Sequence, residues 1–179
     1  MESTIEVLKN RRSIRKFKPE QIKDSELNKI LEAGTYAPSG MGRQSAKIVV
    51  VQNPEIRAKL ARLNSSFLWS DDTEEKHDPF YGASTIIIVL ADKNIKTYIE
   101  DGSLVLGNLM NAAYSIGIGS CWIHRAKEEF ESEEGKALLK DWGIPENYVG
   151  IGHCILGYPY DDTVITPKPR KSDYILYVR

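Results

Sequence analysis

Apolar residues recur along much of this chain at the three- and four-residue spacing of amphipathic helices. Leu27, Ile30 and Leu31 share one face of a helix that begins at Asp24, and this helix should end before Pro38 because proline disfavours helical geometry in the preceding residue. Capping residues, glycine and proline give the limits of the other helices. The spacing predicts helices over residues 3–10, 24–37, 54–68, 101–116 and 133–142.

Short continuous apolar runs separate these helices and are typical of buried strands. The clearest are Ile48–Val51 and Ile86–Ala91. The pattern predicts strands over residues 47–52, 84–91, 117–123 and 148–156, the first two of them buried. Strands that alternate with helices indicate an α/β or α+β sandwich around one central sheet, and periodicity leaves the strand order open.

Two segments have no helical or strand period. Residues 69–82 are polar, acidic and aromatic, and a loop of this length in a compact domain is usually a lid or a binding segment, so we expect it to form the substrate-facing wall. Its aromatic residues Trp69, Phe80 and Tyr81 fit core or dimer packing equally well. Residues 157–179 are rich in proline, then basic, then aromatic and aliphatic, an order that predicts an extended arm.

Composition limits the classes of protein that this chain can be. A length of 179 residues favours one domain, over residues 1–179. Lysine and arginine number 24 against 25 acidic residues, and this balance argues against nucleic acid as a partner. The longest apolar run is too short to span a membrane, and the two cysteines suit a reducing compartment, so we expect a cytoplasmic protein.

Basic residues gather near both ends of this nearly neutral chain, at 11–15 and at 168–171. Arginine forks and the hydroxyl group of Ser13 are donors that bind a phosphate through directed, charge-assisted hydrogen bonds. The pattern predicts one phosphate-bearing cofactor held by both ends of the chain. The alternative is that each basic run is only a solvated face, which is the common fate of a single cluster.

Several familiar site motifs are absent. Neither the Gly117 nor the Gly150 region completes the glycine fingerprint of dinucleotide-binding folds, and the chain has no phosphate-binding P-loop. Ser120 lacks the flanking glycines of a nucleophile elbow, so the sequence shows no hydrolase nucleophile. We interpret this serine as structural or as facing a cofactor.

A metal centre is the main rival interpretation. Cys121, His124, His153 and Cys154 are residue types that bind zinc, and two neighbouring strands could bring them together. Adjacent residues of a strand point to opposite faces, however, so His153 and Cys154 could not both bind one ion. We therefore expect no metal and favour core packing for the cysteines.

Five segments, in this order, resemble the FMN-dependent nitroreductase family. The similarity extends over nearly the whole chain. The segments that carry it are Arg11–Phe17, Ala37–Ser39 with Gln44, Gly119–Ile123, Gly157–Pro159 and Pro167–Arg170.

The resemblance implies an α+β fold, a three-layer sandwich around a central, mostly antiparallel sheet, in a homodimer with a C-terminal arm. It implies one FMN per active site, in a crevice made by both subunits, and ping-pong transfer of hydride from NADH or NADPH to small electron-poor acceptors such as nitroaromatics or quinones. Because a flavin carries this chemistry itself, no catalytic side chain is expected, and His124 receives no proton-transfer role.

Carried over by position, the residues that would hold the phosphate and ribityl oxygens are Arg11, Arg12, Ser13, Arg15, Lys168 and Arg170. The residues that would reach the flavin ring from the partner chain are Pro38, Ser39 and Gly40. The residues that would line the flavin through their main chains are Trp122, Ile123 and His124.

One segment departs from the family pattern. Many relatives have Asn-x-Gln-Pro-Trp where this chain has Gly42, Arg43, Gln44, Ser45 and Ala46, so the contact expected from asparagine is missing and Gln44 is its possible replacement. Asn64 is a further candidate for a contact to the ring. Two alternatives stay open: a flavoprotein of the same fold that carries out dehalogenation, enone reduction or flavin fragmentation, and a flavin-binding protein without catalysis.

Overall fold

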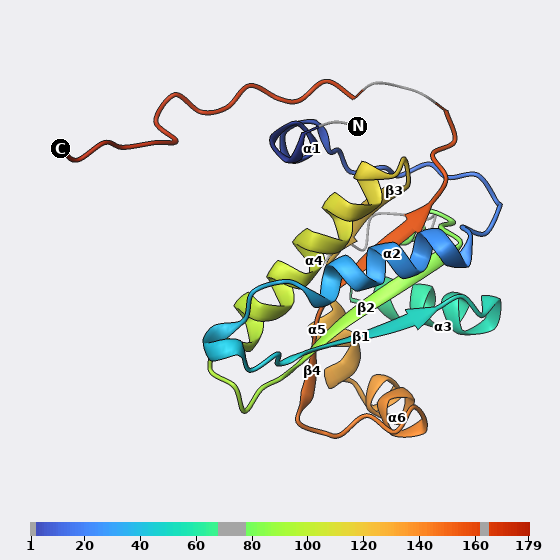
Figure 1. Ribbon diagram of the computed structural model, residues 1–179. Coiled ribbons are helices and arrows are strands. Elements are labelled where there is room, and N and C mark those ends of the chain that lie inside the picture. Colours follow the sequence, from blue (N-terminus) through green and yellow to red (C-terminus); the bar gives the residue numbers. More distant parts are fainter. Residues whose placement is uncertain (1–2, 68–77, 162–164) are drawn as a thin grey trace.

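The computed structural model describes residues 3–67, 78–161 and 165–179 (Figure 1). Its sheet has the strand order β1-β2-β4-β3, and every pair of neighbouring strands is antiparallel. The strands are β1 (Ala46–Val51), β2 (Thr85–Asp92), β3 (Gly119–Ile123) and β4 (Tyr148–Gly157).

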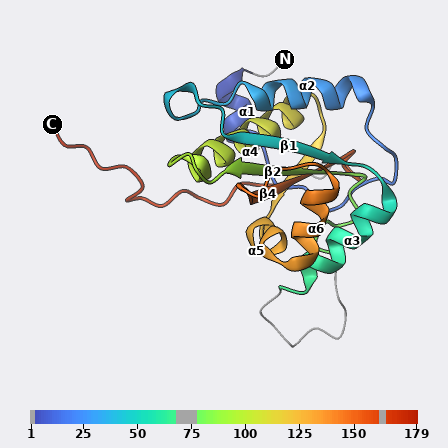
Figure 2. The same cartoon turned by 90° about the horizontal axis from the view of Figure 1, so that it is seen from below.

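Helices cover both faces of this sheet (Figure 2). One face is covered by α1 (Thr4–Asn10), α2 (Asp24–Thr35) and α4 (Tyr98–Ser115). The other face is covered by α3 (Pro54–Ser65), α5 (Ala126–Glu131) and α6 (Glu133–Asp141). The α+β fold and its three layers are therefore confirmed, and so is the antiparallel sheet.

Strand β2 lies at the centre and separates two apolar cores. Ile86, Ile88 and Leu90 face α3, α5 and α6, whereas Ile87 and Val89 face α2 and α4. All five are at most 1% exposed, as the continuous apolar run predicts. Each fully buried isoleucine or leucine contributes about 1.5–3 kcal/mol relative to an exposed one, so this strand anchors both layers.

Strand β1 differs from its prediction as a buried strand. It occupies the edge of the sheet, most of its residues are partly or fully exposed, and Val50 is 37% exposed. An apolar run cannot distinguish a central strand from an edge strand, because position in the sheet depends on distant segments. Among the described residues, β1 pairs only with β2, so its other edge carries no strand.

A bulge in β4 positions the site described below. Val89 pairs with Gly152 and Leu90 with Gly150, so Ile151 is an extra residue without a partner in β2. Ile151 consequently packs on Gly102 of α4, and Gly152 lies under the Trp122 ring. The bulge thus brings Ile151 close to α4 and Gly152 close to the Trp122 ring of β3.

Helix limits agree with prediction where local signals exist. Ser3 and Glu6 form the predicted capping box of α1. Helix α4 begins three residues before the predicted start, and α3 ends at Ser65. Helix α5 was not predicted.

The predicted substrate-facing loop lies largely outside the described residues, because residues 68–77, with Trp69, are among those not described. At its described end, Phe80 is 2% exposed and packs edge-on against His153, with ring centroids 5.2 Å apart. Phe80 therefore belongs to the core, whereas Tyr81 is 42% exposed.

Residues 165–179 contain no helix or strand and leave the body of the molecule as the predicted arm (Figure 1). No helix in the described ranges has both the length and the apolar character needed to cross a membrane.

Candidate functional site

The basic segment after α1 lies along the outer edge of β3. Ser13 forms a parallel bridge with Ser120, and the Ile14 N–H donates to the Ser120 carbonyl oxygen at 2.9 Å. Farther along, the Lys18 N–H donates to the carbonyl oxygen of Tyr158 at 2.9 Å. Main-chain hydrogen bonds therefore hold residues 13–18 against the ends of β3 and β4.

Two buried polar atoms near this segment have no partner among the described residues, the Nη1 atom of Arg11 and the Oγ atom of Ser120. Ser120 pairs with Leu156, so its side chain lies on the α4 side of the sheet, as Cys154 does. Burial raises the pKa of the Cys154 thiol far above its ordinary value, whereas the nearby positive charge of Arg11 acts in the opposite direction. Buried donors are rarely left unpaired, so these two atoms fit an anionic or hydroxyl-bearing ligand.

The other basic residues of this segment differ in their surroundings. The guanidinium group of Arg12 already donates to three main-chain carbonyl oxygens, those of Lys9, Arg11 and Ile165. Arg15 is exposed. Arg12 therefore ties the segment to the start of the C-terminal arm, while Arg11 and Arg15 retain donors for a ligand.

Lys168 and Arg170 lie on the arm, beyond the contact with Arg12. Both are exposed, and the Arg170 guanidinium group donates to the Lys168 carbonyl oxygen. The arm extends away from the molecule (Figure 1). Within one chain, the structure brings the arm to Arg12 at Ile165, and the described contacts do not join Lys168 or Arg170 to Arg11.

The turn with Pro38, Ser39 and Gly40 is held by a buried carboxylate at the start of α4. Asp101 is 3% exposed and accepts hydrogen bonds from the Gly40 N–H at 2.9 Å and from the Ser45 hydroxyl at 2.7 Å. Burial alone would raise the pKa of Asp101, but the hydrogen bonds from Ser45, Gly40 and Thr97 outweigh it, and the pKa lies below its ordinary value.

This turn also contains two residues other than glycine in the left-handed region, Met41 with φ 55° and Gln44 with φ 49°. The Ser39 hydroxyl accepts from the Gln44 N–H at 3.0 Å, and Met41 is 88% exposed at the tip. A strained conformation persists only where its surroundings determine it, and here Asp101 supplies the anchor. The turn therefore holds Met41 exposed at its tip.

A cavity of about 1180 Å³ opens between α4, α5, α6 and the ends of β3 and β4. Its volume exceeds the range of about 300–1,000 Å³ common for small-molecule sites. Residues that line it include Tyr98, Ser103, Trp122, His124, Lys127 and Ile151. Two of the three residues predicted to line the flavin, Trp122 and His124, therefore line the cavity. The Pro38–Gln44 turn of the same chain does not.

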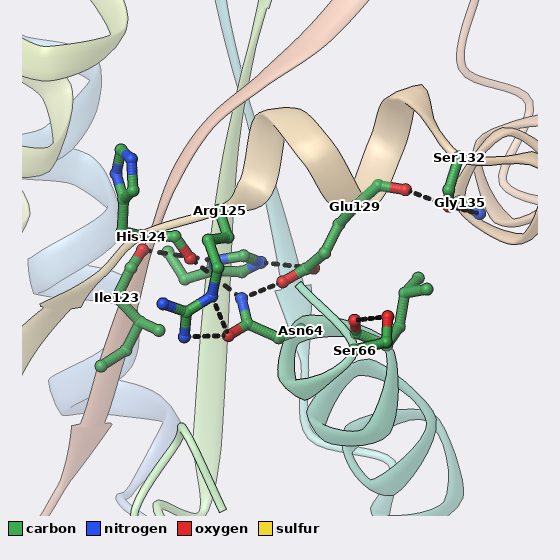
Figure 3. Close-up of polar contacts among 10 residues, drawn as sticks. Asn64, Ser66, Ile123, His124, Arg125, Glu129, Ser132 and Gly135 are labelled. Carbon is green, nitrogen blue, oxygen red and sulfur yellow. Dashed lines mark hydrogen bonds and ion pairs between the residues drawn. The ribbon is translucent and has the colours of Figure 1, made fainter. Parts of the chain in front are cut away.

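Ile123 and Asn64 point away from this cavity. Ile123 is 7% exposed and packs in the core next to α5 and α6. Asn64 is fully buried, and its amide donates to the His124 carbonyl oxygen at 2.9 Å (Figure 3). The side chain of Asn64 therefore faces the interior, and a direct contact with a flavin ring, as suggested from the sequence, does not fit its position.

The zinc interpretation finds no support. Cys121 packs in the core beside α5, and Cys154 in the core beside α4, on the opposite face of the sheet. Both are free thiols. Over residues 3–67, 78–161 and 165–179, no group of histidine, cysteine and carboxylate side chains could hold a metal ion.

Comparison with known proteins identifies the relatives of this chain. A family model described as the nitroreductase family matches residues 8–158. The chain belongs to the nitroreductase family. A protein of Archaeoglobus fulgidus named for NADH dehydrogenase/NAD(P)H nitroreductase activity is 34% identical over 167 residues, which cover 90% of this chain and 88% of the relative.

Solved structures agree with this assignment. A Bacteroides fragilis nitroreductase with bound FMN has a TM-score of 0.89 at 32% identity, and 100% of each chain is covered. A Desulfitobacterium hafniense nitroreductase with bound FMN has a TM-score of 0.86 at 29% identity, again over 100% of each chain. The resemblance to nitroreductases seen in the five sequence segments is confirmed.

FMN fits the polar atoms of this nitroreductase-family chain. Its phosphate and ribityl hydroxyls are the ligand types that the unpartnered atoms of Arg11 and Ser120 require. The sequence leaves Ser120 as either structural or cofactor-facing and gives Asp101 no role in the site. The signal for Asp101 was weak, because a carboxylate in a first helical turn is common on surfaces. Ser120 lies within the segment Gly119–Ile123, and its buried hydroxyl group without a described partner favours the cofactor-facing interpretation.

Proposed function

We propose that this chain is an FMN-dependent NAD(P)H oxidoreductase that reduces small electron-poor acceptors such as nitroaromatics or quinones. In this proposal residues 1–179 form one FMN-binding domain. The observation that carries it is the pairing of Ile14 with Ser120 at 2.9 Å, which sets the basic segment against the strand whose far end borders the cavity. FMN-bound relatives that match the whole chain support the cofactor.

Residues at the two ends of β3 would bind different parts of FMN. Arg11, Ser13 and Arg15 would hold the phosphate and ribityl oxygens at the start of the strand, and Ser120 would add a hydroxyl group. The main chain of Trp122 and His124 would line the ring at its other end. Ser120 directs its carbonyl group to the outer edge, and because main-chain groups alternate along a strand, those of Trp122 point to the same edge.

The bound flavin would accept hydride from the nicotinamide and pass it to the acceptor. The protein has to hold the ring, shape the space above it and limit access of water. Tyr98, Trp122 and the other cavity residues provide walls for nicotinamide and acceptor in turn. This division requires no nucleophilic side chain from the protein.

A homodimer would complete the site. Exposed apolar side chains lie on α1, on α4 and at the tip of the Pro38–Gln44 turn. The arm ends in residues 174–178, each at least 67% exposed. The open edge of β1 could receive such a segment from a second chain. The partner would then contribute Pro38, Ser39, Gly40 and Gln44 to the ring, and Lys168 and Arg170 to the phosphate.

An anaerobic titration tests this function. The purified protein, loaded with FMN, is mixed with NADH and separately with NADPH while the visible absorption band of the flavin is followed. We expect full bleaching by at least one donor, and recovery of the band when a quinone or nitroaromatic is added. A flavin that stays oxidised with both donors would support a flavin-binding protein without catalysis. Reduction without reoxidation by either acceptor would favour another reaction on the same fold.

A further inference from the structure

Three fully buried polar side chains meet beneath the turn that joins β3 to α5. Asn64, Glu129 and His153 are each 0% exposed and come from α3, α5 and β4. Glu129 accepts from the Asn64 amide through one carboxylate oxygen (Figure 3). Its other carboxylate oxygen lies 3.0 Å from the His153 Nε2 atom. Such a cluster is costly to bury unless its hydrogen bonds are made.

Asn64 uses its whole amide group in this cluster. Its nitrogen donates to Glu129 and to the His124 carbonyl oxygen, and its oxygen accepts from the Nε and Nη2 atoms of Arg125, at 3.1 and 2.6 Å. Both amide protons and the carbonyl oxygen therefore have partners. This full use fixes one orientation of the side chain and leaves no amide proton for a ligand.

The same contacts fix the peptide unit between His124 and Arg125. Its carbonyl group points inward to Asn64, and because carbonyl and N–H groups of a trans peptide lie on opposite sides, its N–H points away from the cluster. Arg125 has φ 76°, a left-handed conformation that is uncommon for residues other than glycine. Among the described residues, the Arg125 N–H donates no hydrogen bond.

This N–H belongs to a turn whose neighbours on both sides, His124 and Lys127, line the cavity. We propose that Asn64, held by Glu129 and His153, is a positioning residue that aims the Arg125 N–H at the flavin ring. The proposal rests on the FMN site described above. It extends that site from the residues at the cavity to three buried residues behind it, which touch neither cofactor nor acceptor.

Nuclear magnetic resonance tests the proposal on the unaltered protein. FMN is added to the ¹⁵N-labelled, flavin-free protein, and the amide resonances of Ser13, His124 and Arg125 are followed. We expect the Arg125 amide to shift downfield and to exchange more slowly with water, because it gains an acceptor. A Ser13 shift with an unchanged Arg125 amide would overturn the positioning role while leaving the FMN site intact. No shift at any amide would overturn the proposed function itself.

Variants separate positioning from mere packing. Asn64→Leu removes the amide, and Leu60→Ala, one turn earlier on the same helix at 0% exposure, removes core packing alone. We expect Asn64→Leu to weaken FMN binding by about tenfold and to alter the visible band of bound flavin. Leu60→Ala should lower thermal stability without either effect.

Glu129→Gln is the conservative variant. A glutamine can accept from Asn64 and donate to the His153 Nε2 atom, so FMN affinity and the flavin band should remain those of the wild type. If Asn64→Leu is folded and binds FMN with unchanged affinity and spectrum, the positioning role is wrong. If Asn64→Leu does not fold, the response of the Arg125 amide resonance to FMN in the wild-type protein still tests the positioning role.

Discussion

The main-chain N–H of Ile14 donates to the carbonyl oxygen of Ser120 at 2.9 Å, which joins the segment after the first helix to a strand from the second half of the chain. This bond determines where the basic residues lie. It places Ser13 beside Ser120, whose buried hydroxyl group has no partner among the described residues. Two residues before Ser13, a buried guanidinium nitrogen of Arg11 likewise has no described partner. The account of FMN binding starts from this arrangement.

Replacement of Arg11 or Arg170 by alanine should loosen FMN. If each residue supplies one charged hydrogen bond to the phosphate, its loss weakens binding by about ten- to a hundredfold. Quenching of FMN fluorescence on binding measures the dissociation constant. Arg62→Ala is the matched control, because Arg62 pairs with Glu134 on the surface and its side chain is 69% exposed. Wild-type affinity in both single variants would refute the phosphate clamp.

Asp101→Asn should destabilise the protein in a pH-dependent way. The folded-state pKa of Asp101 lies below its ordinary value, so the carboxylate contributes stability above the unfolded-state pKa of about 4, and this contribution is lost as pH falls through the folded-state pKa. Near neutral pH we expect the free energy of unfolding to drop by about 1–3 kcal/mol.

Urea unfolding of wild type and Asp101→Asn over a series of pH values measures this difference. The gap between the two proteins should close in acid. Asp173→Asn, an exposed carboxylate on the arm, is the control and should change little at any pH. A gap that is constant down to strong acid would show that the charge of Asp101 does not anchor the turn.

The sequence predicts features whose cause is local. Ser3 and Glu6 cap α1 as expected because both partners of the capping box lie within one turn. The apolar run of β2 specifies a buried strand, whereas the similar run of β1 ends at the sheet edge, since position in a sheet depends on distant segments. Helix α5 escaped prediction because it follows the left-handed residue Arg125 and carries no capping side chain.

The site residues also differ in whether local sequence or distant partners determine their roles. Arg11 and Ser13 can be singled out because they stand in a recognisable segment, but the roles of Asn64 and Asp101 depend on partners 56 to 61 residues away. No pattern near Asn64 in the sequence indicates that His124 and Glu129 are its partners. Such buried polar contacts become visible only after the chain has folded.

Cys121 and Cys154 should resist alkylation in the folded protein. They are 1% and 0% exposed, and burial raises the pKa of the Cys154 thiol far above its ordinary value, so little thiolate is available. We expect iodoacetamide to label both thiols in denaturant and to label the folded protein at least about a thousandfold more slowly. Rapid labelling of either cysteine at neutral pH would contradict the two-core arrangement.

Removal of residues 165–179 should yield a monomer with little bound FMN. The deleted arm carries Lys168, Arg170 and the exposed apolar residues 174–178 that we assign to a partner chain. Size-exclusion chromatography with light scattering measures the mass. The double variant Lys168→Ala/Arg170→Ala keeps the arm and should stay dimeric while it loses FMN. A truncated chain that remains a flavin-loaded dimer would be incompatible with the proposed role of the arm.

Sedimentation velocity, recorded in the visible absorption band of flavin, tests the central claim most directly. The account predicts that FMN added to the purified protein sediments with a species of twice the chain mass, at one flavin per chain. Flavin that stays at the meniscus as free FMN, or that travels with a single chain, would contradict an FMN site completed by two copies of this protein.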